Sequence, residues 1–155
     1  MLVQLHVAFI IRYQLDIVKS EYITLTGESV NNSLVARVLI PKNTKFAIFC
    51  NGEIISDVEY NKRRLKGRGG YGHYFGKGHI YDSYTAAKDG NCVASMGNNA
   101  LNLVSSRTGK KAVNNANLIY HNTRLYLISR GKDILPGEEI FYPYGKAYSK
   151  KDYIS

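Results

Sequence analysis

Apolar residues cluster along the first half of the chain in a pattern that predicts two strands. Ser33–Ile40 is a β-rich run that stops at Pro41, where a turn signal begins. Lys45–Cys50 is the second run, and the Asn51-Gly52 pair that follows it is typical of a tight turn. We therefore expect two strands, each of which ends at a turn.

A short helix and a glycine-rich segment are expected next. After the apolar pair at 54–55, Asp57 is placed to cap a helix that runs through Arg64. Residues 67–78 contain six glycines, and this much glycine costs too much backbone entropy for a helix. The segment is therefore expected to be a flexible loop or a bulged hairpin. It also faintly resembles an RNA-binding Arg-Gly-Gly tract, in which arginine and aromatic side chains contact phosphates and bases.

The second half of the chain predicts further short strands. Ala116–Tyr120 and Leu125–Ser129 have the pattern of a strand pair that turns at residues 121–122. The other expected elements are a small-residue segment at 92–100, a polar loop at 105–111, a turn at 136–137 and a strand or strand exit at 139–144. No repeat is visible and no linker divides the chain, so we predict one β-rich α+β domain.

The composition agrees with a folded protein rich in strands. The chain has 155 residues, enough to bury a core, and its 45% hydrophobic and 21% charged residues argue against wholesale disorder. Thirteen Tyr and fourteen Gly, with no Trp, favour strands and turns over a helical bundle. The apolar stretch Met1–Ile11 is too short to span a bilayer and lacks a signal-peptide cleavage site. We expect a buried strand or a short amphipathic helix there.

The cysteines and the net charge indicate which cellular compartment and which binding partners to expect. Cys50 and Cys92 lack the paired spacing of a zinc site, so no metal site is expected, and a reducing intracellular compartment, nuclear or cytoplasmic, is the simpler interpretation. The net charge of +9 includes clusters at Lys62–Lys66 and Lys150-Lys151. These clusters suggest a weak contact with nucleic acid, and a solvated basic surface is the alternative. No membrane contact is expected.

The segment Asp133–Gly145 has the most distinctive sequence of the chain. It reads Asp-Ile-Leu-Pro-Gly-Glu-Glu-Ile-Phe-Tyr-Pro-Tyr-Gly and resembles the C-terminal signature of SET-domain protein-lysine methyltransferases. Further segments resemble other parts of that family, in the family's order: Ile40–Ile55, Ile80–Ser83 with Gly90-Asn91, and Ala94–Ala100 with Asn114–Leu118. The resemblance covers about residues 30–148. It implies an α+β, mostly β, SET-domain β-clip fold of small curved sheets with a C-terminal pseudoknot.

The resemblance also implies how the chain is divided. It assigns a single SET-like domain to residues 1–155, in which 1–30 form an N-terminal flank, 31–56 and 91–145 the two conserved halves of the family, 57–90 a variable insert and 146–155 a short C-terminal lid. The zinc-binding cysteines that often flank this domain in the family do not occur in the sequence.

The activity that the resemblance implies is methyl transfer from S-adenosylmethionine to a lysine of a histone or another protein. The attacking amine must be neutral, but free lysine has a pKa near 10.4, so its neutral form costs about 4–5 kcal/mol at pH 7. An apolar aromatic channel lowers that pKa by desolvating the ammonium group. A chain with thirteen tyrosines suits this chemistry. A basic histone tail would also require a locally acidic groove on this basic protein.

Two tyrosines of the signature take catalytic roles by resemblance. Tyr144 corresponds to the catalytic tyrosine of the family, whose hydroxyl lies beside the transferring methyl group; the alternative is a core tyrosine. Tyr142 occupies the family's phenylalanine/tyrosine switch position, where a hydroxyl takes up space and holds a water. This implies mainly monomethylation, although alternation could simply place Tyr142 on the same face for packing.

The resemblance also implies a set of cofactor-binding residues. Asn98 corresponds to the asparagine that binds the amino-acid end of the cofactor, and Asn99 stands where the family usually has histidine. An alternative registration places this pair at Leu101-Asn102. The other implied cofactor-binding residues are Asn32, Ser33 and Leu34, in the loop that approaches the cofactor, and Tyr148, in an aromatic lid over the adenine.

Several polar residues near the signature are expected to be structural. Asn115 and Asn117 are assigned to the pseudoknot turns. Glu138 and Glu139 look like paired catalytic carboxylates, but in this family they are expected to cap the chain and to pair with backbone or arginine. The four histidines show no ligand spacing and are expected at the surface or in the core.

Departures from the family pattern keep two other functions open. Asparagine and serine at 31–33 replace the family's Gly-x-Gly, although asparagine tolerates positive φ better than most residues. Cys50 replaces a channel tyrosine and Asn99 replaces histidine. These substitutions motivate a catalytically inactive SET-like binding module as an alternative. The third hypothesis is a basic nucleic-acid-binding protein that uses residues 62–78 and the lysine-rich tail.

Overall fold

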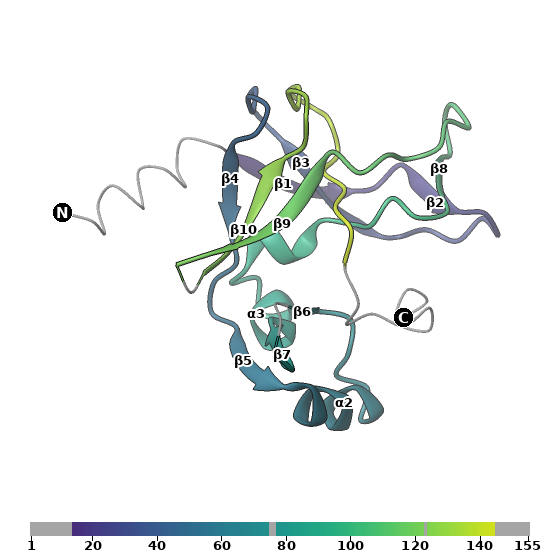
Figure 1. The fold of residues 1–155 in the computed structure, drawn as a ribbon. Coiled ribbons are helices and arrows are strands. Elements are labelled where there is room, and N and C mark those ends of the chain that lie inside the picture. Colours follow the sequence, from purple (N-terminus) through teal and green to yellow (C-terminus); the bar gives the residue numbers. More distant parts are fainter. Residues whose placement is uncertain (1–13, 75–76, 123, 145–155) are drawn as a thin grey trace. The chain divides into compact units, whose positions relative to one another are not determined.

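The computed structural model describes residues 14–74, 77–122 and 124–144, and within them short strands outnumber helices (Figure 1). The chain divides into two compact units. Of the described residues, the first unit contains those from 14 to 48 and from 96 to 143, and the second contains those from 49 to 95 together with Tyr144. The expected N-terminal element at 1–11 and the expected lid at 146–155 lie outside the described residues.

The largest sheet of the first unit has three antiparallel strands. β4 (Lys45–Ile48), β10 (Arg124–Ser129) and β9 (Ala116–His121) pair in that order. The β9–β10 hairpin confirms the strand pair expected from the sequence, with Tyr126 opposite Ile119. On β10, Leu125–Leu127 and Ser129 are buried, so both faces of this central strand are largely covered.

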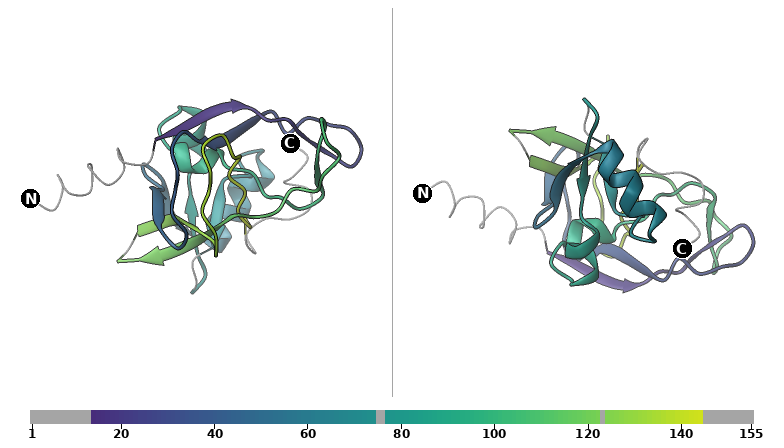
Figure 2. Two further views of the ribbon diagram at one scale, coloured as in Figure 1. Left: turned by 90° about the horizontal axis from the view of Figure 1, so that it is seen from above. Right: turned by 90° about the horizontal axis from the view of Figure 1, so that it is seen from below.

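Two smaller sheets complete the first unit, as Figure 2 shows from above and below. β1 (Leu15–Lys19) pairs with β3 (Asn32–Ala36), and β2 (Tyr22–Thr24) pairs with β8 (Leu103–Ser105). The expected strand at 33–40 was too long, because the chain bends at residues 37–38 after the Arg37 amide donates to Gln14. These small separate sheets confirm the mostly β architecture.

The C-terminal segment of the first unit is held by parts of the chain that are remote in sequence. Ile134 pairs with Ile40, Glu139 with Val35 and Phe141 with Asn98, all as isolated bridges. The expected strand at 139–144 is therefore a series of bridges to different partners. The buried Ile134, Ile140 and Tyr142 anchor the segment in the core. A segment joined in this way to several earlier parts of the chain has the connectivity expected of a pseudoknot.

Asn115 fixes this segment through its side chain. Its Oδ1 accepts a hydrogen bond from the Phe141 amide at 2.9 Å, and its Nδ2 donates to the Glu139 carbonyl at 2.9 Å. Asn115 is nearly buried, so both bonds replace water that the side chain has lost. Asn117, in contrast, lies in β9 opposite Ile128, and its assignment to a turn was wrong.

The second unit contains a three-stranded sheet and two short helices. β5 (Glu53–Ser56), β7 (His79–Asp82) and β6 (Gly72–Tyr74) pair in that order, so the glycine-rich segment contributes a strand. The helices are α2 (Asp57–Leu65) and α3 (Tyr84–Lys88), and a 3-10 turn spans Val93–Met96 at the boundary of the two units. Among the described residues, no helix has the length and apolar character needed to cross a membrane.

The start of α2 differs by one residue from the expectation. Ser56, and not Asp57, is the N-cap, because its side chain accepts a hydrogen bond from the Glu59 amide at 3.1 Å. A serine three residues before a glutamate is the spacing of a capping box. Asp57 and Glu59 then lie in the first turn, where their negative charge is favourable to the helix dipole.

Candidate functional site

Asn98 joins two segments that the sequence assigned to cofactor binding. Its Nδ2 donates to the Asn32 carbonyl at 3.0 Å and to Glu139 Oε1 at 3.4 Å. Its own carbonyl accepts from the Tyr142 amide at 2.9 Å. The structure therefore brings together three of the residues selected from the sequence, Asn32, Asn98 and Tyr142, within the first unit.

Glu139 is the acceptor at the centre of this arrangement. Its carboxylate accepts hydrogen bonds from Ser20 Oγ at 2.8 and 3.0 Å as well as from Asn98. Burial raises the pKa of Glu139, and the hydrogen bonds from Ser20 and Asn98 act in the opposite direction. The expectation of a backbone or arginine partner for this side chain was wrong, because a hydroxyl and an amide occupy its oxygens. Ser20 lies outside every motif, so no local signal could have selected it.

The residues of the loop at 31–34 differ in backbone conformation and in exposure to solvent. Asn31 has a φ of 63°, so asparagine does take the left-handed conformation expected where the family has glycine. Asn32 is exposed at the start of β3, whereas Ser33 and Leu34 are fully buried. The Leu34 carbonyl accepts from the Ile140 amide at 2.7 Å. Of the predicted loop residues, Asn32 is therefore the one whose side chain is accessible to a ligand.

Tyr142 is completely buried and packs against a glycine. A Cβ built on Gly97 would lie 2.6 Å from Cε1 of the Tyr142 ring, which is far inside normal contact distance. Gly97 is thus the residue that makes room for this ring, directly before Asn98. Gly97 was not among the site residues predicted from the sequence, where its only signal is a glycine within a segment of small residues.

Tyr144 belongs to the second unit, where it lies beside a buried histidine. The Tyr144 and His73 ring centroids are 6.4 Å apart, and Tyr144 is half-buried. Burial lowers the pKa of His73 to about 3, and a hydrogen bond to the Tyr144 backbone acts in the opposite direction. His73 also packs edge-on against Phe49 at 4.7 Å. The imidazole of His73, only 1% exposed, thus lies beside Tyr144, the residue to which the sequence resemblance assigns the catalytic role.

A second tyrosine hydroxyl lies near the position where the family tyrosine is replaced. The Tyr81 hydroxyl accepts a hydrogen bond from the Gly52 amide at 3.0 Å, two residues after Cys50. Burial raises the pKa of Tyr81 to about 12, so the hydroxyl stays protonated at neutral pH. The Cys50 amide donates to Cys92 Sγ at 3.4 Å, and burial raises the pKa of the Cys50 thiol to about 11. In the sequence, Tyr81 was noted only as part of the segment 80–83. Its contact with Gly52 arises from the pairing of β5 with β7, which a local pattern does not reveal.

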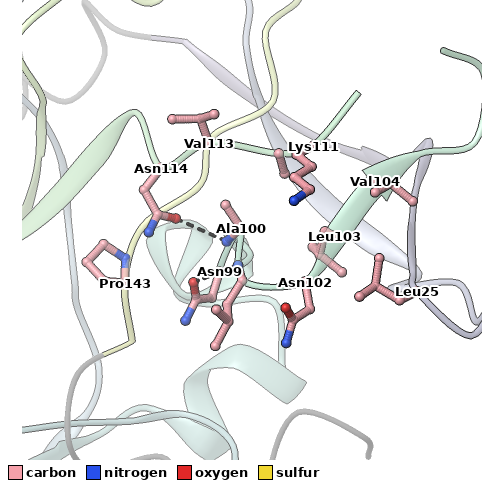
Figure 3. Close-up of a pocket in the computed structure, with 12 residues that line it drawn as sticks. Leu25, Asn99, Ala100, Asn102, Leu103, Val104, Lys111, Val113, Asn114 and Pro143 are labelled. Atoms are coloured by element: carbon pink, nitrogen blue, oxygen red, sulfur yellow. Dashed lines mark hydrogen bonds between the residues drawn. The ribbon is translucent and has the colours of Figure 1, made fainter. Parts of the chain in front are cut away.

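A pocket of about 520 Å³ lies in the first unit beside Asn99 (Figure 3). In the figure, Asn99, Asn114 and Pro143 lie at one end, and Leu25 and Val104 lie at the other. The volume is within the range of small-molecule sites, which combine apolar walls with a few polar groups. The complete lining is Leu25, Asn99, Ala100, Leu101, Asn102, Leu103, Val104, Lys111, Ala112, Val113, Asn114 and Pro143.

Polar side chains fix the wall of this pocket. Asn114 Oδ1 accepts from the Ala100 amide at 3.0 Å, and Asn99 Oδ1 accepts from the Leu101 amide at 3.1 Å. Both registrations considered for the cofactor asparagine pair, 98–99 and 101–102, place residues on this wall. The remaining predicted cofactor residue, Tyr148, lies outside the described residues.

Comparisons with known proteins agree with the architecture. The family model described as SET domain matches residues 31–145. A solved structure of Chaetomium thermophilum Polycomb Repressive Complex 2 bound to GSK126 is similar, with a TM-score of 0.61 and 19% identity over 89% of this chain and 16% of that chain. A humanized mutant of the same complex, bound to the same inhibitor, gives a TM-score of 0.59 and 22% identity over 88% of this chain and 15% of that chain. None of the curated proteins matches the sequence.

Proposed function

We propose, because the chain belongs to the SET domain family, that it is a protein-lysine methyltransferase that uses S-adenosylmethionine. The observation that carries the proposal is the extent of the family match, which includes the Asn32 loop, Asn98 and both signature tyrosines. The fold supports it through the C-terminal segment, which bridges to β3 and to Asn98.

The residues of the first unit fit the cofactor chemically. When bound, S-adenosylmethionine supplies a methyl group on a positively charged sulfur. Asn32 and Asn99 present accessible amides, and the pocket beside Asn99 combines apolar walls with carboxamides. Asn98 keeps the Asn32 loop next to Glu139 through its two hydrogen bonds. We assign binding to Asn32, Asn98 and Asn99, with Ser33 and Leu34 as the buried support of the loop and Tyr148 as part of the lid.

The tyrosines are proposed to prepare the attacking amine. A lysine ammonium must lose a proton before it attacks, and an environment of aromatic rings with little water lowers its pKa. The Tyr144 hydroxyl then orients the neutral amine, which brings the reacting atoms into line. His73 remains neutral behind Tyr144, so it adds no positive charge that would repel the substrate.

Replacement of one hydroxyl tests this role. Tyr144→Phe is expected to lower the rate of radiolabelled methyl transfer at least about tenfold, as for other losses of a positioned hydrogen-bonding group. The assay screens core histones and a peptide library with the full chain. Tyr74→Phe is the matched control, because Tyr74 is an exposed tyrosine of β6 outside the signature. An unchanged rate for Tyr144→Phe would remove this residue from the mechanism.

The proposal also covers the degree of methylation and the substrate. We infer mainly monomethylation, since Tyr142 carries a hydroxyl and its ring is held in place by burial against Gly97. The similar structures come from a Polycomb complex, which makes a histone lysine the first substrate to test and a chromatin-associated, nuclear location the first to examine.

An inactive SET-like binding module is the second candidate, and one observation favours it. Both bonds made by Asn98 Nδ2 already go to protein acceptors, so this amide donor is occupied in the structure. Titration with S-adenosylmethionine separates the two functions. Saturable binding below millimolar concentration supports the enzyme, and no binding at millimolar concentration supports the module.

A further inference from the structure

Three carboxylates of the second unit form ion pairs with one and the same arginine. Arg63 of α2 forms ion pairs with Glu53 at 2.9 Å, Glu59 at 3.1 Å and Asp82 at 3.0 Å. Three of the acidic side chains in this unit are thus used by one arginine. Other cations of this unit, Arg68 and Lys88 among them, take no part in these three ion pairs.

Two of those cations pair with aromatic rings instead. The Arg68 guanidinium lies 5.2 Å from the centroid of the Tyr84 ring, and its Nη2 donates to Thr85 Oγ1 at 2.9 Å. The Lys88 ammonium lies 5.5 Å from the Tyr71 ring and 5.6 Å from the Tyr84 ring. The two rings contact each other edge to face at 5.9 Å. We call Arg68, Tyr71, Tyr84 and Lys88 the basic tyrosine surface.

This arrangement leaves both positive charges available. A cation over a ring keeps its full charge, whereas a carboxylate partner would cancel it. Arg68 and Lys88 are exposed, and the contacts with the rings restrict their side chains before a ligand arrives. Lys62 and Lys66 near the end of α2 add further positive charge, while Asp57 at its start and exposed Asp89 next to Lys88 oppose it. The balance of these groups together with Arg68 and Lys88 is positive.

We propose that the basic tyrosine surface binds the phosphate backbone of duplex nucleic acid, independently of methyl transfer. Charge complementarity favours a polyanion, and a guanidinium and an ammonium are the groups that most often contact backbone phosphates. Because cations already cover the Tyr71 and Tyr84 rings, these rings are not open platforms on which single-stranded bases stack. Binding is therefore independent of sequence and depends strongly on salt.

The salt dependence gives a quantitative test. Each phosphate contact adds about 0.9 to the slope of log affinity against log salt concentration. Arg68→Gln with Lys88→Gln removes two contacts, so the slope is expected to fall by about 1.8. Between about 50 and 200 mM salt, the wild-type affinity should then fall about 12-fold more than that of the variant. The measurement is fluorescence anisotropy with a labelled duplex DNA of mixed sequence and the full chain, without S-adenosylmethionine.

Two controls isolate the surface. Lys110→Gln with Lys132→Gln removes the same net charge from exposed positions of the first unit and should leave the slope unchanged. Arg68→Lys with Lys88→Arg retains both charges and should keep the wild-type slope, which shows that the surface tolerates substitution.

The outcomes are distinguishable. A lower slope for the first variant alone supports the proposal, whatever the methyl-transfer assay shows. Equal loss in both double glutamine variants would mean that only net charge matters and would overturn it. Tighter binding of single-stranded DNA, or equally tight binding of an acidic polypeptide such as polyglutamate, would also overturn it, because the partner would then be of another class.

Discussion

The buried imidazole of His73 makes the stability of the protein depend on pH in a predictable direction. Burial lowers the pKa of His73 from its ordinary value of 6.5 to about 3. Between these two values the unfolded chain binds a proton that the folded chain does not. The stability that His73 contributes is therefore fully present above about pH 6.5 and is lost as the pH falls toward 3. Replacement of His73 by phenylalanine should remove this dependence, since phenylalanine does not titrate.

The magnitude follows from the size of the shift. Between pH 6.5 and pH 4.5 the unfolded chain holds one more proton than the folded protein, and each pH unit then lowers the free energy of unfolding by about 1.36 kcal/mol. The free energy of unfolding therefore falls by about 2.6 kcal/mol between pH 7 and 4.5. His73→Phe should lose that much less over the same interval than the wild type. Phenylalanine retains a ring against Phe49, which limits the cost at pH 7.

Urea unfolding followed by circular dichroism at these two pH values measures the difference. Other titrating groups contribute equally to both proteins, so the comparison isolates one histidine. His121→Phe, at an exposed position, controls for the simple loss of an imidazole. Equal pH dependence in wild type and His73→Phe would refute the reasoning, because it would mean that His73 takes up its proton as readily in the folded protein as in the unfolded chain.

Three further predictions concern other contacts. Gly97→Ala should lower the free energy of unfolding by about 1–3 kcal/mol in urea, because the new Cβ overlaps the buried Tyr142 ring; wild-type stability would show that the ring moves freely. Tyr142→Phe should shift products toward di- and trimethyl-lysine in mass spectrometry, and identical product ratios would refute the switch assignment. Arg63→Met should cost about 3 kcal/mol because it leaves the buried Asp82 carboxylate without its cation, whereas Arg37→Met, at an exposed pair, should cost less than about 1 kcal/mol; equal losses would contradict this.

Elements whose partners are close in sequence were the predictable part of the fold. The β9–β10 hairpin has two apolar runs around a short turn, and both strands formed near their expected bounds. The helix α2 was also found, with an error of one residue because Ser56 and Asp57 are both capping residues. β1 and β2 were not expected, since each is short and partly exposed, and their pairing with β3 and β8 is not evident from a local pattern.

In the candidate site, too, contacts between side chains that are far apart in sequence could not be predicted. Positive φ at Asn31 follows from the residue type, so the sequence could predict it. The family resemblance selected Asn98 and Glu139, but it did not predict that Ser20 would be a partner of Glu139, because 119 positions separate them. Gly97 and His73 were likewise not selected, since their roles arise from the rings that pack on them. Residue type predicts conformation here, whereas contacts across the fold require the structure.

The isolated bridge between Val35 and Glu139 has a consequence for synthesis of the protein. On a ribosome that adds about 5–20 residues per second, the 104 residues that follow Val35, up to and including Glu139, take about 5–20 s to make. During that time β3 has its earlier neighbour β1 on one edge, while its other edge has no partner of its own chain. Unpaired strand edges of this kind attract other chains. Slow translation or high expression should therefore favour aggregation of the nascent protein, and chaperones that cover β-edges should raise its yield.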